Sequence, residues 1–200
     1  MSCRVATLTF LAVVFALCAS SRADEDGSFC TSIGYLAYEL SNGTTPGVAG
    51  HVLKVVRFGP ERGMYMAGEV TLQDFQVHRM ICSQDRVEIS GWGNIYKKYT
   101  IDVGGQKLNI VDFTEEPTKR FDPSKDGPEP SSFRFAEPGT LALESADPDR
   151  KYTLLLSASD KIVQGGVEHH RKAELIQANS QGTALQNLVL YEGDILETID

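Results

Sequence analysis

Residues 95–103 read IYKKYTIDV, and this stretch shows the pattern that runs through much of the chain. Apolar Ile95, Tyr99 and Ile101 are separated by polar residues at alternating positions. Because successive side chains of a strand point to opposite faces, this alternation predicts a strand with one buried and one solvated face. Comparable runs predict strands at about 33–40, 51–58, 64–72, 74–82, 86–92, 95–103 and 106–113.

Turn-forming residues separate these runs and keep the connections short, for example at 41–47, 59–63 and 83–85. Short connections favour antiparallel neighbours, so we expect an antiparallel meander. Strand patterns return at 132–135, 140–144 and 152–157. The fold class predicted is therefore mainly β, either a sandwich or a small barrel, because the alternating pattern is the same in both.

Two segments depart from the strand pattern. Residues 114–139 are rich in proline and charge, which predicts a long surface loop. Residues 159–191 are expected to form a C-terminal helical segment, since Ser159 or Asp160 can cap a helix and the apolar residues that follow have a loose helical spacing. For residues 183–191, helix and strand are both open.

The first 23 residues have the layout of a secretory signal peptide, with Arg4 near the start, an apolar run over 8–19 and small residues before an acidic stretch. An uncleaved signal anchor is the alternative. No later segment is apolar and long enough to cross a membrane. We expect a secreted or periplasmic protein whose residues 24–200 form a single β-rich domain.

Cleavage of this leader would leave two cysteines, Cys30 and Cys82. A pair of cysteines in an oxidising compartment usually forms a disulfide, so we predict one here, with two free buried thiols as the alternative. Asn42 begins the sequon Asn-Gly-Thr, which would be a glycosylation site in a eukaryotic source.

Charge and motifs exclude several classes of function. The formal net charge is −8 and no basic stripe is present, which disfavours nucleic-acid binding. The sequence contains no Gly-x-Ser-x-Gly motif and no P-loop, and we expect no cofactor.

The best candidate for ligand binding is the single tryptophan, Trp92, which lies between two glycines where a strand is expected to end. Its ring could stack on a sugar or another planar ligand, or it could close the end of a β core. An aromatic ligand surface would form if Trp92 shared a face with Tyr35, Tyr38, Tyr96 and Tyr99.

The best candidate for metal binding is His169 with His170 and Glu174. On a helix, His170 and Glu174 would lie one turn apart on one face and could hold a divalent metal with a further ligand. The alternative is a solvated polar face.

These observations lead to three hypotheses about function. The first is an exported, non-enzymatic binding or interaction domain whose partner is a small molecule, a glycan or a protein. The second is a metal-dependent hydrolase that uses His170 and Glu174. The third is a structural envelope or matrix protein.

Overall fold

In a computed structural model, the chain forms three antiparallel sheets, each built on a meander of four consecutive strands. The structure describes residues 27–41, 50–59, 63–73, 75–126, 133–134 and 138–198. The signal peptide predicted for residues 1–23 and the sequon at Asn42 lie outside these residues.

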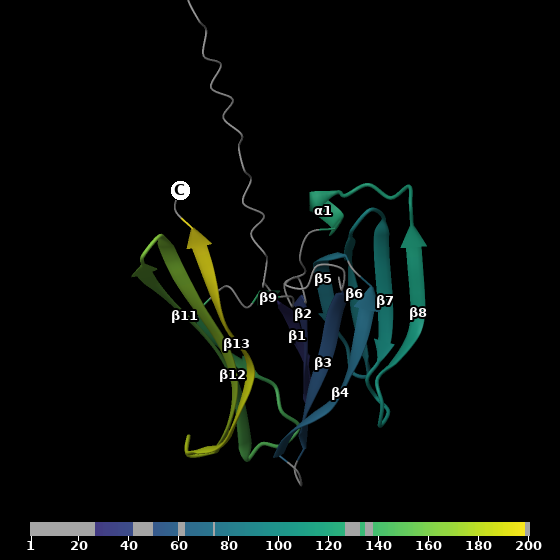
Figure 1. The fold of residues 1–200 in the computed structure, drawn as a ribbon. Helices are drawn as coiled ribbons and strands as arrows, with labels where there is room; N and C mark the ends of the chain where they lie inside the picture. The colour runs from purple at the N-terminus through teal and green to yellow at the C-terminus, as the bar shows by residue number, and fades with distance from the viewer. Residues whose placement is uncertain are drawn as a thin grey trace, which may run out of the picture.

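The three sheets follow one another along the chain (Figure 1). Sheet A contains β1 (Ser28–Ser32), β2 (Tyr35–Ser41), β3 (Gly50–Gly59) and β4 (Gly63–Gln73), and the short β9 (Phe133–Arg134) pairs with β1. Sheet B contains β5 (Gln76–Cys82), β6 (Arg86–Trp92), β7 (Tyr96–Asp102) and β8 (Asn109–Glu116). Sheet C contains β10 (Gly139–Leu143), β11 (Arg150–Val163), β12 (Gly166–Asn179) and β13 (Ala184–Thr198). The prediction of a mainly β fold with antiparallel meanders is confirmed.

Sheet A lies between sheets B and C and is buried on both faces (Figure 1). In β2, Tyr35 and Ala37 belong to the core shared with sheet B, whereas Leu36 and Tyr38 belong to the core shared with sheet C. A strand covered on both faces has a nearly continuous apolar run rather than a polar alternation. The core between sheets A and B also contains Leu53, Val55, Met80, Ile89 and Ile101, and the core between sheets A and C contains Phe29, Val56, Tyr152, Leu154 and Leu175.

A disulfide between Cys30 and Cys82 joins sheet A to sheet B, as predicted. Cys30 lies in β1 and Cys82 ends β5, and their Cα atoms are 5.5 Å apart. Tyr35 supports the same junction, because its hydroxyl donates to the backbone carbonyls of Ser83 and Arg86. The two sheets are therefore linked by a covalent bond and by hydrogen bonds beside it.

The C-terminal helix predicted over residues 159–191 is wrong, because this region forms the end of β11, all of β12 and most of β13. Leu154 and Leu156 face the core from β11, and Ala173 and Leu175 face it from β12, so the buried positions alternate. The two strands form a hairpin whose turn needs Gly165, since this residue has a φ of 88°. Gln164 and Gly165 form the turn, and Gly166 begins β12 opposite Val163.

The segment predicted as a long loop, residues 114–139, contains the end of β8, the short helix α1 (Pro123–Asp126) and β9 in its described part. Residues 117–126 turn back from β8 toward the top of sheet B, where α1 lies above β5 and β6 (Figure 1). We call residues 117–126 the return segment. No helix among the described residues is long and apolar enough to span a membrane.

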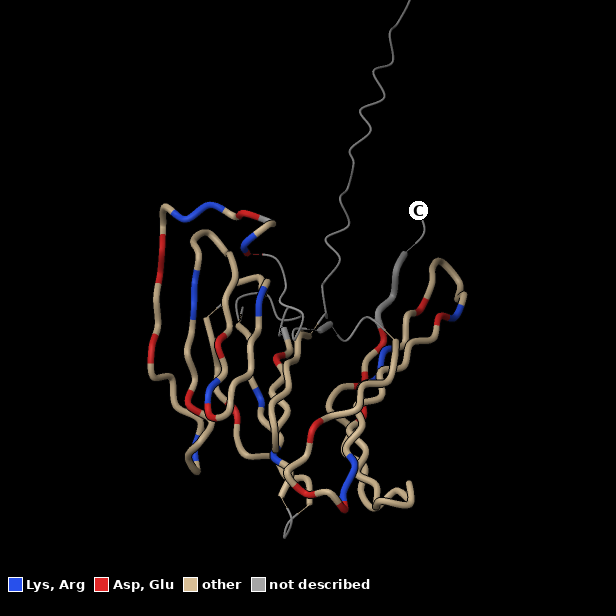
Figure 2. Tube along the Cα trace, turned by 180° about the vertical axis from the view of Figure 1, so that it is seen from behind, with Lys and Arg blue, Asp and Glu red and all other residues tan. Residues whose placement is uncertain are grey.

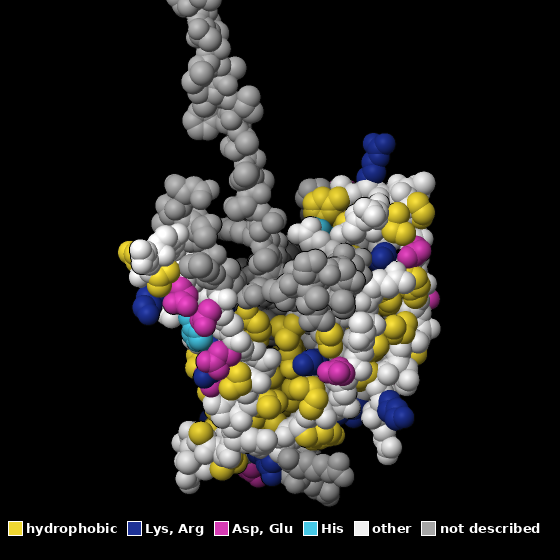
Figure 3. All heavy atoms as spheres, viewed as in Figure 1, with side chains coloured by type: hydrophobic (Ala, Val, Ile, Leu, Met, Phe, Trp, Pro, Cys, Tyr) yellow, Lys and Arg dark blue, Asp and Glu magenta, His cyan; other side chains and the backbone are white. Residues whose placement is uncertain are grey.

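Charged residues are spread over all three sheets. Acidic and basic positions are interleaved along the trace rather than segregated by sign (Figure 2). Hydrophobic side chains gather along the seam between sheets C and A on the face shown in Figure 3.

Candidate ligand-binding site

Trp92 and Tyr96 lie side by side on the outer face of sheet B. Trp92 ends β6, Tyr96 begins β7, and the two residues are direct partners in the antiparallel pairing. Their ring centroids are 4.7 Å apart with an interplanar angle of 54°. Gly91 allows β6 to approach β5 here, because a Cβ atom at this position would lie 1.8 Å from the Gln76 carbonyl oxygen.

Further aromatic residues approach Trp92 from β5 and from the return segment. The His78 ring in β5 meets Trp92 at 5.4 Å in an edge-to-face arrangement. Phe121 of the return segment lies 5.1 Å from Trp92, with an interplanar angle of 87°, and 5.0 Å from His78. We call Trp92, Tyr96, His78 and Phe121 the aromatic cluster.

The return segment is ordered by a single capped turn. Asp122 accepts hydrogen bonds from the backbone amide and hydroxyl of Ser124, and these bonds hold the pKa of the Asp122 carboxyl below its usual value. The Asp126 amide donates to the Asp122 carbonyl at 2.7 Å. The turn is held to β5 by a long hydrogen bond of 3.4 Å from Arg79 Nη1 to the Lys125 carbonyl.

Lys119 places its ammonium group against the aromatic cluster. Its Nζ atom lies 3.7 Å from the Tyr96 ring centroid and 5.3 Å from that of Trp92. Asp126 pairs with the same atom at 3.0 Å. Burial opposes the charge of Lys119, but hydrogen bonds to Asp126 and Tyr96 outweigh it, so the pKa of Lys119 lies above its usual value. The site therefore holds a positive charge between two aromatic rings and a carboxylate.

Burial within the cluster is uneven. Tyr96 is almost covered, whereas Phe121 is 46% exposed. The indole nitrogen of Trp92 is buried and its N–H has no acceptor among the described residues. Buried donors without a partner are rare in folded proteins. The cluster thus combines apolar ring faces, a cation and a spare hydrogen-bond donor.

The other three tyrosines of the predicted aromatic surface lie elsewhere. Tyr35 and Tyr99 are buried between sheets A and B, and Tyr38 is buried between sheets A and C. Burial raises the pKa of the Tyr38 hydroxyl to about 12 and also raises the pKa of Tyr35 and Tyr99. Of the five predicted residues, the fold brings together only Trp92 and Tyr96.

The predicted metal ligands lie on β12 rather than on a helix, so His170 and Glu174 are separated by about 13 Å of extended chain. The Nδ1 atom of His170 lies 2.7 Å from an Asp194 carboxylate oxygen. Glu174 accepts a hydrogen bond from Asn187 and pairs with Lys172.

His169 points to the opposite face of β12 from His170. Its Nδ1 atom lies 3.0 Å from an Asp160 carboxylate oxygen, which also pairs with Arg171 at 3.0 Å. In the part of the chain that the structure describes, no three His, Cys, Asp or Glu side chains are close enough to hold a metal ion.

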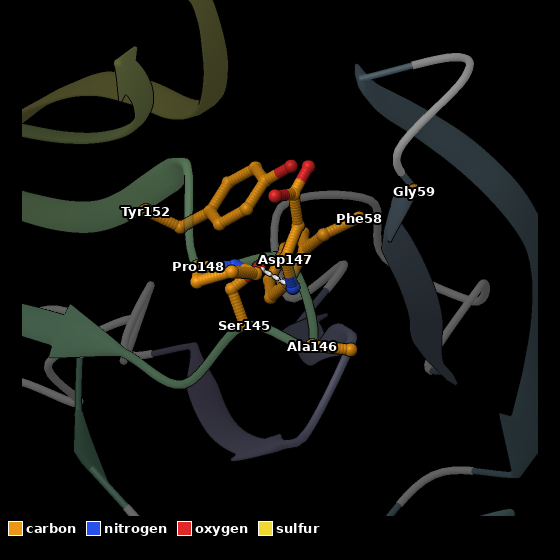
Figure 4. Close-up of a pocket in the computed structure, with 7 residues that line it drawn as sticks. All are labelled: Phe58, Gly59, Ser145, Ala146, Asp147, Pro148 and Tyr152. Carbon is orange, nitrogen blue, oxygen red and sulfur yellow. Dashed lines mark hydrogen bonds between the residues drawn. The ribbon is translucent and has the colours of Figure 1, made fainter. Parts of the chain in front are cut away.

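A cavity of about 290 Å³ lies at the junction of sheets A and C (Figure 4). It is lined by Phe58, Gly59, Ser145, Ala146, Asp147, Pro148 and Tyr152. The Phe58 and Tyr152 rings stack at 4.4 Å, and Asp147 pairs with Arg150 at 3.3 Å. Because Asp147 is paired, the cavity offers mainly aromatic surface and is a weaker candidate than the aromatic cluster.

One buried pair of ionisable side chains was not anticipated from the sequence. His51 Nδ1 lies 2.7 Å from a Glu39 carboxylate oxygen, and the other oxygen of Glu39 accepts from the Ser28 amide at 3.1 Å. Both residues are less than a tenth exposed, and the His51 ring lies 5.2 Å from that of Phe75. Glu39 lies two positions after Ala37 in β2, and His51 lies two positions before Leu53 in β3, so both continue the strand faces that point toward sheet B. This spacing is the signal that could have found them.

The sequence alone also did not place Lys119, Phe121 and His78 at the aromatic cluster.

Comparison of the chain with protein-family models, with curated proteins and with solved structures gives no match. Arguments about function therefore depend on the geometry of the site alone.

Proposed function

We propose that this chain is an exported, non-enzymatic binding domain whose ligand contacts the aromatic cluster on sheet B. The observation that carries the proposal is the pairing of Trp92 with Tyr96 on an outer sheet face, beside an indole N–H for which the described residues supply no acceptor. Aromatic faces supply contact area at low entropic cost, and an unpaired donor supplies a place for a ligand oxygen.

Export is supported by two features. The first 23 residues have signal-peptide character, and the Cys30–Cys82 disulfide is typical of proteins that fold in an oxidising compartment. A disulfide-linked scaffold also suits a binding domain, because it anchors sheet B, which carries the site, to sheet A.

The test uses Trp92 as its own probe, since the chain contains a single tryptophan. Oligosaccharides, organic ammonium ions and planar aromatic compounds are titrated separately into the purified protein while tryptophan emission is recorded. We expect a saturable change with at least one class. In Tyr96→Leu, the affinity for that ligand should fall at least about tenfold. In the control Leu185→Ala, at an exposed position on sheet C, it should not change.

Two outcomes would overturn the proposal. One is turnover in a broad hydrolase screen that disappears on substitution of one polar residue. The other is a wild-type protein whose emission responds to no ligand class but which assembles into large oligomers by native mass spectrometry, as expected of an envelope or matrix protein.

A further inference from the structure

Lys119 sits where an external cation would bind. An ammonium group within about 6 Å of the face of a tryptophan or tyrosine ring is attracted by the ring quadrupole. The Lys119 Nζ atom meets this condition for Tyr96 at 3.7 Å and for Trp92 at 5.3 Å. Asp126 completes the site with a carboxylate 3.0 Å from Nζ. The geometry is that of an occupied cation site whose occupant belongs to the same chain.

We propose that Trp92, Tyr96 and Asp126 form a binding site for an external organic ammonium group, and that Lys119 fills this site when no ligand is bound. This inference rests on the proposed binding function and names its ligand class. A methylated ammonium group suits the site better than a primary one, because it is weakly hydrated and loses less solvation when it enters between two rings.

Charges of both signs lie around the site. Glu116 pairs with Tyr96 in the β7–β8 ladder, and Lys97, the next residue after Tyr96, pairs with Glu115. Selection for a cation therefore comes from the two ring faces and the Asp126 carboxylate.

The side chain of Lys119 can leave the rings without disturbing the sheet. Among the described residues, the return segment contacts β5 through the 3.4 Å hydrogen bond from Arg79 to the Lys125 carbonyl and through the Phe121 ring, which lies 5.0 Å from His78. It contacts β8 through the 3.3 Å bond from the Lys119 amide to the Glu116 carbonyl. Phe121 is nearly half exposed. Trp92 and Tyr96, by contrast, are fixed by the paired strands β6 and β7. The two ring walls therefore stay in place when the lysine leaves.

An internal occupant weakens the binding of an external ligand. The apparent dissociation constant rises by the reciprocal of the fraction of molecules whose site is open. If Lys119 fills the site in about nine molecules of ten, removal of its charge strengthens external binding about tenfold. Lys119→Met keeps the length of the side chain but removes the ammonium group, and Lys119→Gln does the same with a polar end.

The matched control is Lys98→Met. Lys98 lies two residues from Tyr96 on the same strand and pairs with Glu88 at 2.7 Å. This substitution removes one positive charge from the same face of sheet B without touching the rings, so it separates a general change in potential from the release of the site.

The experiment titrates tetramethylammonium into each variant and follows Trp92 emission and calorimetric heat at constant ionic strength. We expect weak binding to the wild type and to Lys98→Met, and binding at least about tenfold tighter to both Lys119 variants. Choline should behave as tetramethylammonium does, whereas its neutral isostere 3,3-dimethylbutanol should bind none of the variants, because it lacks the charge. Melting temperatures show that each variant is folded.

Equal or weaker binding of tetramethylammonium by two folded Lys119 variants would overturn the inference. So would equal binding of the neutral isostere, which would mean that the site is simply apolar. In either case, a change in Trp92 emission on addition of an oligosaccharide or a planar compound would still support the proposed binding function. If no ligand class changes the emission, both the binding function and the ammonium site are refuted.

Discussion

The strongest prediction concerns the disulfide. Replacement of Cys30 and Cys82 by alanine should lower the free energy of unfolding by about 4 kcal/mol, because the bond closes a loop of 52 residues. Cys30 is also fully buried, so loss of its sulfur leaves a small void that adds roughly 1 kcal/mol. Since a domain is stabilised by only about 5–15 kcal/mol in total, the bond supplies a large share.

The assay is urea unfolding followed by the emission of Trp92, the single tryptophan. With a denaturant dependence of about 2 kcal/mol per molar urea, a loss of 4 kcal/mol moves the midpoint down by about 2 M. Wild-type protein unfolded in reductant should show nearly the same midpoint as the double variant, since both lack the bond. Alkylation followed by mass spectrometry establishes that Cys30 and Cys82 of the wild-type protein are fully reduced.

A shift of the urea midpoint of less than about 0.5 M, with both cysteines fully reduced, would refute the reasoning. It would mean that residual structure already restricts the unfolded chain, or that the cross-link strains the native state. The single variant Cys30→Ala checks the packing contribution, because it should differ from reduced wild type by no more than the cost of the void.

Other predictions concern the cores and the buried tyrosines. Leu154→Ala should cost about 3–4 kcal/mol in chemical denaturation because Leu154 is fully buried, whereas Ile162→Ala, at a position 85% exposed, should stay within about 0.5 kcal/mol. Tyr35→Phe should cost about 1 kcal/mol, because the partly buried carbonyls of Ser83 and Arg86 lose the hydroxyl donor, although the Arg86 carbonyl keeps the Ser83 amide. The raised pKa of Tyr38, about 12 against 10.0, means that the unfolded chain ionises first, so stability is complete below pH 10 and falls between pH 10 and 12. In urea unfolding, the free energy of unfolding should fall by up to about 1.4 kcal/mol per pH unit for each such tyrosine. The variant Tyr38→Phe should show a shallower fall over the same pH range.

The strands of sheets A and B could be predicted because their alternation of apolar and polar residues is local. Residues 86–92 and 95–103 were predicted as strands, and the structure has β6 and β7 there with nearly the same bounds. The assignment of strands to sheets could not be predicted, because the period-two pattern does not say which neighbour covers a face. The double burial of β2 was visible only as a nearly continuous apolar run.

The prediction of a helix after Ser159 was wrong for a different reason. Beyond Leu156, β11 leaves the core: residues 158–162 are exposed, and residues 167–172 of β12 are only partly buried. Without burial, the alternation vanishes and a weak helical spacing remains in the sequence. The long pairing of β11 with β12 supplies the missing stabilisation, and such pairing depends on partners that local patterns do not reveal.

For the aromatic residues, the spacing along a strand predicts which side chains share a face of the sheet, because successive side chains point to opposite faces. Tyr96 and Tyr99 are three positions apart, so in a regular strand they point to opposite faces, and the same holds for Tyr35 and Tyr38. The sequence could therefore have excluded a surface that contains all of them, and the core burial of Tyr99 agrees with this argument.

The position of Lys119 cannot be predicted in this way, because it lies in a segment without strand periodicity. It contacts Tyr96 only because that segment turns back over sheet B. The two ring walls follow from local strand pairing, but the group between them follows from the tertiary fold. Since the group between the walls decides whether an ammonium ion, a sugar or nothing binds there, the ligand class depends on the part of the site that the sequence alone could not place. Substitution of Lys119, rather than of the rings, is therefore the informative change.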